Sequence, residues 1–336
     1  MNGPEITAPE ADAVLSLKSL IQKDFDADMR RQEEHTPVLE PNRTDESLPK
    51  SVHFAWKEAV KAEIILSETA DFKESVRFCG RGSVRVFNLL PGREYYYKLV
   101  CGEYVSPVRH FTVAFELPRQ IYLPEMTNVR DCGGWLLADN RRRKYNMIFR
   151  GGQMEPWTAL PHGSAINMQG EKVWFDLKIK TDLDLRSDGE SYFPEDKVSY
   201  KKLPTTAYAT WQETGIFSAE AMEQIRKIFE FFADETVYPV YMHCMGGGDR
   251  TGTIAFLLGA MLGMSDEDLI NDYEYSNLSL SGERCRCSVV WKAFMAKLNE
   301  FAPGGTKQEQ VINYLEKCGV TEEIREKIAA ALIEKK

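Results

Sequence analysis

The spacing of apolar residues divides the chain into three stretches that predict different structures. Between residues 11 and 31, apolar side chains recur at three- and four-residue intervals, which predicts an amphipathic helix. The stretch 32–49 is polar and contains proline, as linkers do. We therefore expect residues 1–48 to form an N-terminal helix and linker, with the helix packed on its own protein or on a partner.

The second stretch consists of short segments in which apolar and polar residues alternate. Segments 52–56, 62–66 and 84–87 have this pattern, and turn-forming residues separate them. Several short strands at this spacing predict a small all-β sandwich, which we expect over residues 49–116.

The third stretch mixes strand-like and helical patterns. The segment 174–186 predicts a short helix and then a strand, and 237–242 predicts a buried strand. Ser218 and Ser265 are typical helix N-caps, and residues after Cys285 have amphipathic helical spacing. We expect residues 117–336 to form an α/β domain with a central, mostly parallel sheet flanked by helices.

Composition limits the classes of function. A net charge of −9 over 336 residues argues against binding to nucleic acid or to anionic membranes. No apolar run approaches the roughly 18 residues that a membrane span needs, and the N-terminus lacks the features of a signal peptide. The sequence leaves open both export, after removal of a signal peptide, and a cytoplasmic location, and it does not determine the oligomeric state.

The seven cysteines match neither a disulfide framework nor a zinc site. Cys285 and Cys287 are too close together for the usual zinc spacing, and no histidine lies near them. We expect most of the cysteines to be small buried hydrophobic residues, and we expect no metal and no other cofactor.

Residues 243–253, His-Cys-Met-Gly-Gly-Gly-Asp-Arg-Thr-Gly-Thr, carry the candidate chemistry. They join the predicted strand to an apolar helix, and a glycine-rich turn before a helix N-terminus binds anions through its backbone N–H groups. The pKa of a thiol there is expected to fall from about 8.5 to roughly 3.5–7.5, and a planar guanidinium can bind two phosphate oxygens. Cys244 and Arg250 therefore predict a cysteine-dependent phosphatase, whose phosphate-binding residues are Met245, Gly246, Gly247 and Gly248.

One segment of the predicted sandwich resembles the Leu-x-Pro-Gly-x-x-Tyr corner of fibronectin type III domains. It comprises residues 89–99, Leu-Leu-Pro-Gly-Arg-Glu-Tyr-Tyr-Tyr-Lys-Leu. The resemblance implies that the Tyr95 hydroxyl ties a loop back to the strand, with Tyr97 and Leu99 on the same face. Such domains are spacers or binding modules.

Residues 243–251 resemble the His-Cys-x5-Arg-Thr/Ser signature of the protein tyrosine phosphatase superfamily. Four further motifs resemble those of its bacterial and fungal tyrosine phosphatase family, in the same order. They are 128–134 (Asn-Val-Arg-Asp-Cys-Gly-Gly), 149–152 (Phe-Arg-Gly-Gly), 184–190 (Asp-Leu-Arg-Ser-Asp-Gly-Glu) and 272–277 (Asp-Tyr-Glu-Tyr-Ser-Asn). The resemblance implies an α/β phosphatase that works without a metal.

The resemblance also implies roles for the residues of the loop. The Cys244 thiolate attacks phosphorus and forms a cysteinyl-phosphate, while Arg250 stabilises the equatorial oxygens. His243 orients the loop. Thr251 donates its hydroxyl to the sulfur and helps the sulfur leave in the second step.

The leaving group needs a proton from a carboxylic acid. Asp184 is preferred, because the family's Asp-Leu-Arg segment supplies this residue. Asp249 is the main alternative, although a carboxylate inside the loop opposes thiolate formation unless a cation engages it. Asp182 and Asp188 are further alternatives.

Two departures from the family and three supporting residues complete the predicted site. Gly248 stands where the family often has lysine, and Cys132 stands where leucine is usual, which we interpret as a change in packing. Arg150 and Arg186 are expected to hold either the acid segment or Asp131 in place.

The expected function is a phosphatase acting on phosphotyrosyl or mixed phosphoamino-acid proteins. A phosphoinositide or inositol-phosphate phosphatase is the alternative on the same scaffold, although residues 245–248 lack the lysines that polyanionic headgroups favour. A non-catalytic phosphate-binding module, with the β-domain as its functional part, is the alternative of another class. The expected partner is a phosphorylated protein or a phosphorylated small molecule as substrate.

Overall fold

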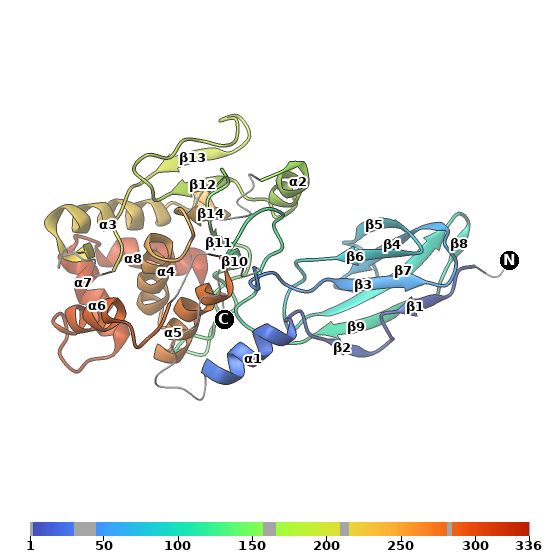
Figure 1. Ribbon diagram of the computed structural model, residues 1–336, viewed down its shortest axis with the longest axis horizontal. Helices are drawn as coiled ribbons and strands as arrows, with labels where there is room; N and C mark the ends of the chain where they lie inside the picture. Colours follow the sequence, from blue (N-terminus) through green and yellow to red (C-terminus); the bar gives the residue numbers. More distant parts are fainter. Residues whose placement is uncertain (1–2, 30–44, 157–165, 209–214, 281–283, 336) are drawn as a thin grey trace. The chain divides into compact units, whose positions relative to one another are not determined.

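The computed structural model describes residues 3–29, 45–156, 166–208, 215–280 and 284–335 (Figure 1). These residues form two compact units. One lies within Met1–Lys23 and Pro49–Tyr122, and the other within Asp24–Leu48 and Leu123–Lys336. The helix α1 (Leu20–Met29) contains residues of both.

The first unit is built from strands. They are β1 (Ile6–Ala8), β2 (Ala13–Leu15), β3 (Val52–Trp56), β4 (Lys61–Ser67), β5 (Val76–Arg81), β6 (Ser83–Val86), β7 (Glu94–Cys101), β8 (Tyr104–Val105) and β9 (Arg109–Val113). One sheet has the order β1-β3-β6 and the other β2-β9-β7-β4-β5, with β8 paired to β7. Side chains of both sheets share a single core.

The tyrosine corner predicted from the sequence is present in β7. Tyr95, Tyr97 and Leu99 are alternate residues of this strand, and all three are buried in the shared core. The Tyr95 hydroxyl accepts a hydrogen bond from the Leu90 N–H at 2.8 Å, which ties the preceding loop to the strand. The likeness of the whole unit to a fibronectin type III domain stays a prediction.

The N-terminal residues differ from the predicted helix and linker over 1–48. β1 pairs with β3 and β2 pairs with β9, so the helix begins only at Leu20. The helical spacing of apolar residues was misleading, because the edges of two sheets offer the backbone hydrogen-bond partners that override a local preference. Residues 30–44 of the predicted linker lie outside the described residues.

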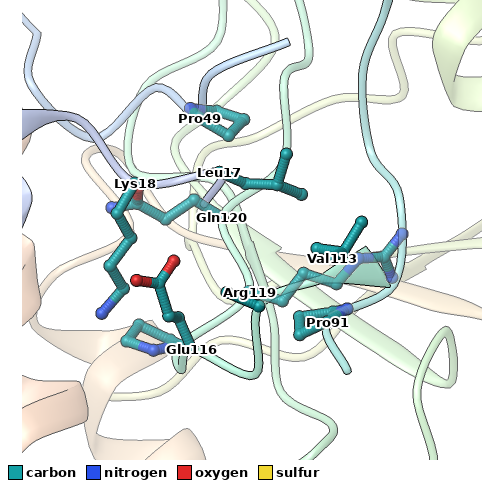
Figure 2. A pocket seen from close by; sticks show the side chains of 10 residues that line it. Leu17, Lys18, Pro49, Pro91, Val113, Glu116, Arg119 and Gln120 are labelled. Atoms are coloured by element: carbon teal, nitrogen blue, oxygen red, sulfur yellow. The ribbon is translucent and has the colours of Figure 1, made fainter. Parts of the chain in front are cut away.

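Figure 2 shows a pocket of this unit that Lys18 and Glu116 help to line. The Lys18 ammonium donates to the carbonyl oxygen of Leu117 at 2.6 Å, and Glu116 accepts a hydrogen bond from the Ser16 hydroxyl at 2.7 Å. The unit therefore continues beyond the expected boundary at residue 116, and its last residue is Tyr122.

The second unit is an α/β structure. Its strands are β10 (Arg130–Asp131), β11 (Ile148–Gly151), β12 (Thr181–Asp184), β13 (Ser199–Lys202) and β14 (Val240–His243). Its helices are α2 (Met168–Asp176), α3 (Ala219–Phe232), α4 (Arg250–Met261), α5 (Asp266–Glu274), α6 (Val289–Asn299), α7 (Lys307–Lys317) and α8 (Glu322–Leu332), with 3₁₀ turns η1 (Gly215–Phe217), η2 (Glu235–Val237) and η3 (Tyr275–Leu278). In Figure 1, α3 to α8 gather together and α2 lies apart from them.

The sheet of this unit has the order β10-β11-β14-β12-β13. β10 pairs antiparallel with β11, and the other three pairings are parallel, as the sequence predicted. Gly151 of β11 and Asp184 of β12 both lie opposite His243 of β14. The carboxyl ends of these three strands therefore meet at one edge of the sheet, where ligands bind in α/β folds.

Most of the predicted helix starts are confirmed. The hydroxyls of Ser218 and Ser265 cap α3 and α5 by accepting the N–H three residues later.

The predicted strand over 237–242 begins later, at Val240, because Pro239 has no N–H to donate and η2 precedes it. None of the helices in the described ranges is long and apolar enough to cross a bilayer.

Candidate active site

The loop between β14 and α4, residues 244–249, turns its carbonyl groups outward. Four carbonyl oxygens accept hydrogen bonds from groups outside the loop: Met245 from the Gln153 N–H (2.9 Å), Gly246 from Asn128 Nδ2 (3.0 Å), Gly247 from Arg150 Nη2 (2.8 Å) and Gly248 from the Tyr208 hydroxyl (3.0 Å). The N–H groups of residues 245–249 meet no acceptor among the described residues. Backbone N–H groups without an acceptor, in a loop directly before the N-terminus of α4, are what an anion site requires.

Glycine is required at one position of this loop. Gly247 has a φ of +71°, and a Cβ there would lie 2.4 Å from the carbonyl carbon and oxygen of Gly151. The loop therefore packs directly on the backbone at the end of β11, because any side chain at Gly247 would separate the two.

Cys244 lies at the start of the loop and is buried. Burial raises the pKa of its thiol, but hydrogen bonds from the Thr251 hydroxyl and N–H and the charge of Arg250 outweigh it and lower the pKa below its ordinary value. The Thr251 hydroxyl makes no hydrogen bond to an oxygen or nitrogen in the described part of the chain, so it is available to the sulfur. Cys244 is thus positioned to react as a thiolate.

The guanidinium of Arg250 is available to an anion. Arg250 is the first residue of α4, and among the described residues its side chain has no hydrogen-bond or ion-pair partner. A planar guanidinium beside backbone N–H groups can bind two oxygens of a phosphoryl group.

His243 and Asp182 form a buried pair behind the loop. The Nε2 atom of His243 lies 2.9 Å from Asp182 Oδ1, and its Nδ1 lies 3.1 Å from the carbonyl oxygen of Cys244. Burial by itself lowers the pKa of His243, but Asp182 outweighs burial and raises this pKa to about 9. Asp182 therefore holds a cationic histidine against the loop, a position that does not suit a proton donor to substrate.

Asp184, the preferred proton donor in the sequence, lies in a buried ion pair. Its carboxylate is fully buried and accepts hydrogen bonds from the guanidinium of Arg186 at 2.8–3.1 Å and from the Tyr200 hydroxyl at 2.9 Å. Burial raises the pKa of Asp184, yet the hydrogen bonds from Arg186 outweigh it and lower the pKa. A carboxylate held ionised and away from solvent is poorly suited to protonate a leaving group, so this placement does not favour Asp184, and its role as the donor stays a prediction.

Asp249, the main alternative, is open to solvent. Its side chain is 56% exposed, and its Oδ2 accepts a hydrogen bond from Arg284 Nη2 at 2.8 Å. It precedes α4 without forming a side-chain cap to that helix. The cation that a carboxylate in the loop requires is therefore Arg284, a residue the sequence did not single out.

Arg150 holds the loop through a buried ionic hub. Asp272 binds Arg130 at 2.7 Å and Arg150 at 2.5 Å, and Arg150 also donates to the Gly247 carbonyl. Burial raises the pKa of Asp272, but the two arginines outweigh it and lower the pKa to about 2. Arg150 thus positions the loop itself, where the sequence predicted that it would hold the acid segment or Asp131.

Asp131 binds backbone groups through its side chain. Its carboxylate accepts hydrogen bonds from the N–H groups of Gly133 and Asn146 at 2.7 and 2.9 Å. It thereby connects the turn after β10 to the segment that leads into β11.

Comparison with known families identifies the family of this chain. The model of the tyrosine phosphatase family matches residues 121–334, which is most of the chain and nearly all of the α/β unit. The chain belongs to the tyrosine phosphatase family. Family membership places it among the hydrolases of the protein tyrosine phosphatase type.

Two individual proteins show weaker similarity to this chain than the family model does. A tyrosine-protein phosphatase of Nostoc commune is 26% identical over 133 residues, covering 32% of this chain and 43% of that protein. The chain thus spans less than half the length of this curated relative. The core catalytic domain of the PP-IP phosphatase SIW14 from S. cerevisiae, solved with citrate, aligns at 12% identity and a TM-score of 0.30, over 51% of this chain and 94% of that one. A TM-score this low supports no conclusion about fold or function.

Sequence reasoning missed several residues that build the phosphatase site. Asn128 and Asp272 belong to the motifs 128–134 and 272–277, which could have marked them, but no role followed from the motifs alone. Tyr208 and Arg284 carry no signal in the sequence, since their role depends on contacts with a loop far along the chain.

An acidic hollow lies beside the loop. Met245 borders it, together with Glu155, Asp188, Glu190 and Tyr192. Arg186 also lines it, but its guanidinium is already bound to Asp184 and Glu155 at 2.8 Å each. The described residues contain no cluster of three or more histidine, cysteine or acidic side chains that could hold a metal.

Proposed function

We propose that this protein is a cysteine-dependent phosphomonoesterase that acts on phosphotyrosyl or mixed phosphoamino-acid proteins. One observation carries the proposal: a thiol with a lowered pKa lies in a loop whose N–H groups, like the guanidinium of Arg250, have no partner among the described residues. The thiol supplies the nucleophile, and the N–H groups and the guanidinium stabilise the charge of a transferring phosphoryl group.

In the first step the Cys244 thiolate attacks phosphorus in line with the leaving group. The P–S bond forms as the P–O bond breaks, and the leaving oxygen takes a proton. The loop N–H groups and Arg250 bind the three equatorial oxygens throughout. The product is a cysteinyl-phosphate and a free hydroxyl compound.

In the second step water attacks phosphorus and the P–S bond breaks. Inorganic phosphate leaves, and the sulfur returns to the thiolate form. The Thr251 hydroxyl that lowers the pKa of Cys244 also stabilises the departing thiolate. His243 and Asp182 keep the start of the loop fixed during both steps.

We propose Asp249 as the proton donor. It belongs to the loop itself and is open to solvent, whereas Asp184 is buried in an ion pair with Arg186. Asp188 is the remaining alternative, because it is exposed and lines the hollow beside Met245.

The hollow favours a protein substrate over a polyanionic one. Glu155, Asp188 and Glu190 surround it, and the charge of Arg186 is already satisfied by carboxylates. Additional phosphates of an inositol phosphate or phosphoinositide would be repelled there, while Tyr192 and Met245 offer apolar surface to a phosphotyrosyl ring.

For the all-β unit we propose a fibronectin type III-like spacer or binding module. Its support is the Tyr95 corner, with alternate residues of β7 buried between two sheets.

A substrate panel tests the proposed activity. Phosphotyrosyl peptides, phosphoseryl peptides, a phosphoinositide and an inositol polyphosphate are each assayed for phosphate release, with Cys244→Ser as the blank. We expect turnover of phosphotyrosyl peptides to exceed that of the two inositol compounds by at least about tenfold, the effect of roughly 1.4 kcal/mol of repulsion. Preferential hydrolysis of the inositol compounds would establish the alternative substrate class, and activity in Cys244→Ser would rule out the mechanism.

A leaving-group comparison tests the proton donor. Asp249→Asn should reduce kcat/KM for phenyl phosphate by about 10²–10⁴-fold and spare p-nitrophenyl phosphate, whose leaving group departs without a proton. Asp184→Asn and Asp188→Asn are the matched comparisons. If either of them shows the leaving-group dependence and Asp249→Asn does not, Asp249 is not the donor.

A further inference from the structure

The backbone of Gly248 is covered by a guanidinium from a distant segment. A Cβ built on Gly248 would lie 2.5 Å from Arg284 Nη2, 3.0 Å from Cζ and 3.1 Å from Nε. The 2.5 Å separation is shorter than a Cβ contact can be, so a side chain at Gly248 would displace the guanidinium of Arg284. A cation thus reaches the loop at the position where the related phosphatases often carry lysine.

The same guanidinium binds the neighbouring carboxylate. Arg284 Nη2 donates to Asp249 Oδ2 at 2.8 Å, and the side chain of Arg284 is only 11% exposed, against 56% for Asp249. The arginine is therefore the buried partner of the pair and the aspartate the exposed one. Because Nη2 engages Oδ2, the second oxygen of the carboxylate is left to face substrate or solvent.

The segment that carries Arg284 is anchored to the end of α5 and to η3. The Asn277 side chain donates to the Arg284 carbonyl and accepts from the Arg284 N–H. Two residues later, Arg286 binds Glu274 through its N–H at 2.8 Å and its guanidinium at 2.7 Å. A disulfide between Cys285 and Cys287, which the sequence did not predict, closes the same turn. These contacts hold the Arg284 backbone in place.

We propose that Arg284 is a positioning residue for the proton donor, and that Gly248 provides the space through which it reaches Asp249. The inference rests on the proposed function, in which Asp249 protonates the leaving group. An exposed aspartate explores several rotamers, and misplacement of a catalytic group by about 1 Å can cost on the order of 10²-fold in rate. Holding one carboxylate oxygen restricts these rotamers and aims the other oxygen at the leaving group.

The proposal makes a specific prediction about leaving groups. Arg284→Gln should reduce kcat/KM for phenyl phosphate by about 10–100-fold, the cost of a misplaced acid. It should change kcat/KM for p-nitrophenyl phosphate less than about threefold, because that reaction does not need the acid. Arg284→Lys, which keeps the charge and one donor, should recover part of the loss.

Matched variants separate this role from a general structural one. Arg325 binds Glu316 at 2.8 Å with side-chain exposures of 14% and 53%, nearly those of the Arg284–Asp249 pair. Arg325→Gln should therefore leave the ratio of the two substrates unchanged. If Arg284→Gln folds poorly, Arg284→Lys keeps the test decisive, because it should show the same leaving-group dependence with a smaller loss.

A double-mutant cycle decides between the possible outcomes. If Arg284 acts through Asp249, Asp249→Asn combined with Arg284→Gln should lose no more than Asp249→Asn alone. Equal losses for both substrates would overturn the inference, since they would show that Arg284 acts on the phosphoryl group. If Asp249→Asn shows the leaving-group dependence and Arg284→Gln does not, the inference fails and the proposed donor stands. If Asp249→Asn lacks the dependence, both fail.

Discussion

At the scale of single residues, the surroundings of a thiol decide its chemistry. Cys132 and Cys244 are both buried. Burial raises the pKa of Cys132 to about 11, whereas the hydrogen bonds from Thr251 and the charge of Arg250 lower the pKa of Cys244 despite its burial. Cys132 is therefore an inert packing residue, as the sequence suggested for the position where leucine is usual.

Removal of the Thr251 hydroxyl should raise the pKa of Cys244. A hydrogen bond to a charged group contributes about 1.5–3 kcal/mol, and Thr251→Ala removes such a bond from the thiolate, so this pKa should rise. The thiolate then forms only at higher pH, and inactivation by iodoacetamide should begin at a correspondingly higher pH. Thr251→Ser keeps the hydroxyl and should leave the pH dependence of inactivation unchanged. If Thr251→Ala also leaves it unchanged, the Thr251 N–H and Arg250 are sufficient to lower the pKa of Cys244.

At the scale of elements, neighbouring strands bring charged pairs together behind the loop. Asp182 of β12 lies opposite Tyr241 of β14, and its carboxylate reaches His243, two residues further along that strand. The register of two parallel strands, which the sequence does not display, thus creates the ion pair.

Asp182→Asn should destabilise the protein in a pH-dependent way. Breaking a buried pair costs about 3–5 kcal/mol at neutral pH. The pKa of His243 is about 9 in the folded protein. In the unfolded chain it is about 6.5. The stabilisation by His243 is therefore complete below about pH 6.5, as long as Asp182 is ionised, and is lost as pH rises through about 9. Burial raises the pKa of Asp182, so the pair also weakens at acidic pH.

Urea unfolding of the native protein and Asp182→Asn at several pH values measures this difference. The difference between the two should shrink between pH 6.5 and 9. Asp176→Asn, which loses only an exposed pair with Lys172, is the control. A difference that does not vary with pH would show that His243 is neutral in the folded state.

Helix α5 connects two strands to the loop. Asp272→Asn would leave the buried guanidinium groups of Arg130 and Arg150 without their carboxylate, at a cost of about 3–5 kcal/mol. Because Arg150 also holds the Gly247 carbonyl, phosphate binding should weaken as well. Urea unfolding and calorimetric titration with phosphate measure both effects. The control is Asp266→Asn, in the exposed first turn of the same helix, which should change the free energy of unfolding by no more than about 1 kcal/mol. If Asp266→Asn and Asp272→Asn lose the same stability, the ionic hub around Asp272 is contradicted.

At the scale of the whole molecule, the chain carries two compact units, and the residues of the proposed phosphate site all belong to one of them. A ligand that binds one folded unit stabilises that unit by mass action. The other unit has its own core and gains nothing from ligand binding unless the two are energetically coupled.

Phosphate should therefore protect only the α/β unit. At about 100 times its Kd it should add about 2.7 kcal/mol to the unfolding free energy of that unit. Hydrogen exchange followed by mass spectrometry should show slower exchange in peptides from β14 and unchanged exchange in peptides from β7. Arg250→Met should abolish the protection, and protection of β7 as well would demonstrate coupling between the units.

Much of this protein was predictable from local sequence. The loop chemistry at Cys244 and Arg250, the caps at Ser218 and Ser265, the short strands of the β-unit and the Tyr95 corner all depend on residues close together in the chain. Periodicity, capping and turn preferences act over a few residues, so a sequence displays them directly.

Only the tertiary structure gives the surroundings of each candidate carboxylate, on which the proposed choice of Asp249 rests. Asp184 and Asp249 are both aspartates beside the loop, and burial against Arg186 or exposure beside Arg284 separates them. The contacts that matter join residues far apart in the chain, such as Arg150 with Asp272 and Arg284 with Asp249. Charge and burial at such sites depend on how distant segments pack, and the sequence by itself carries no record of those distances.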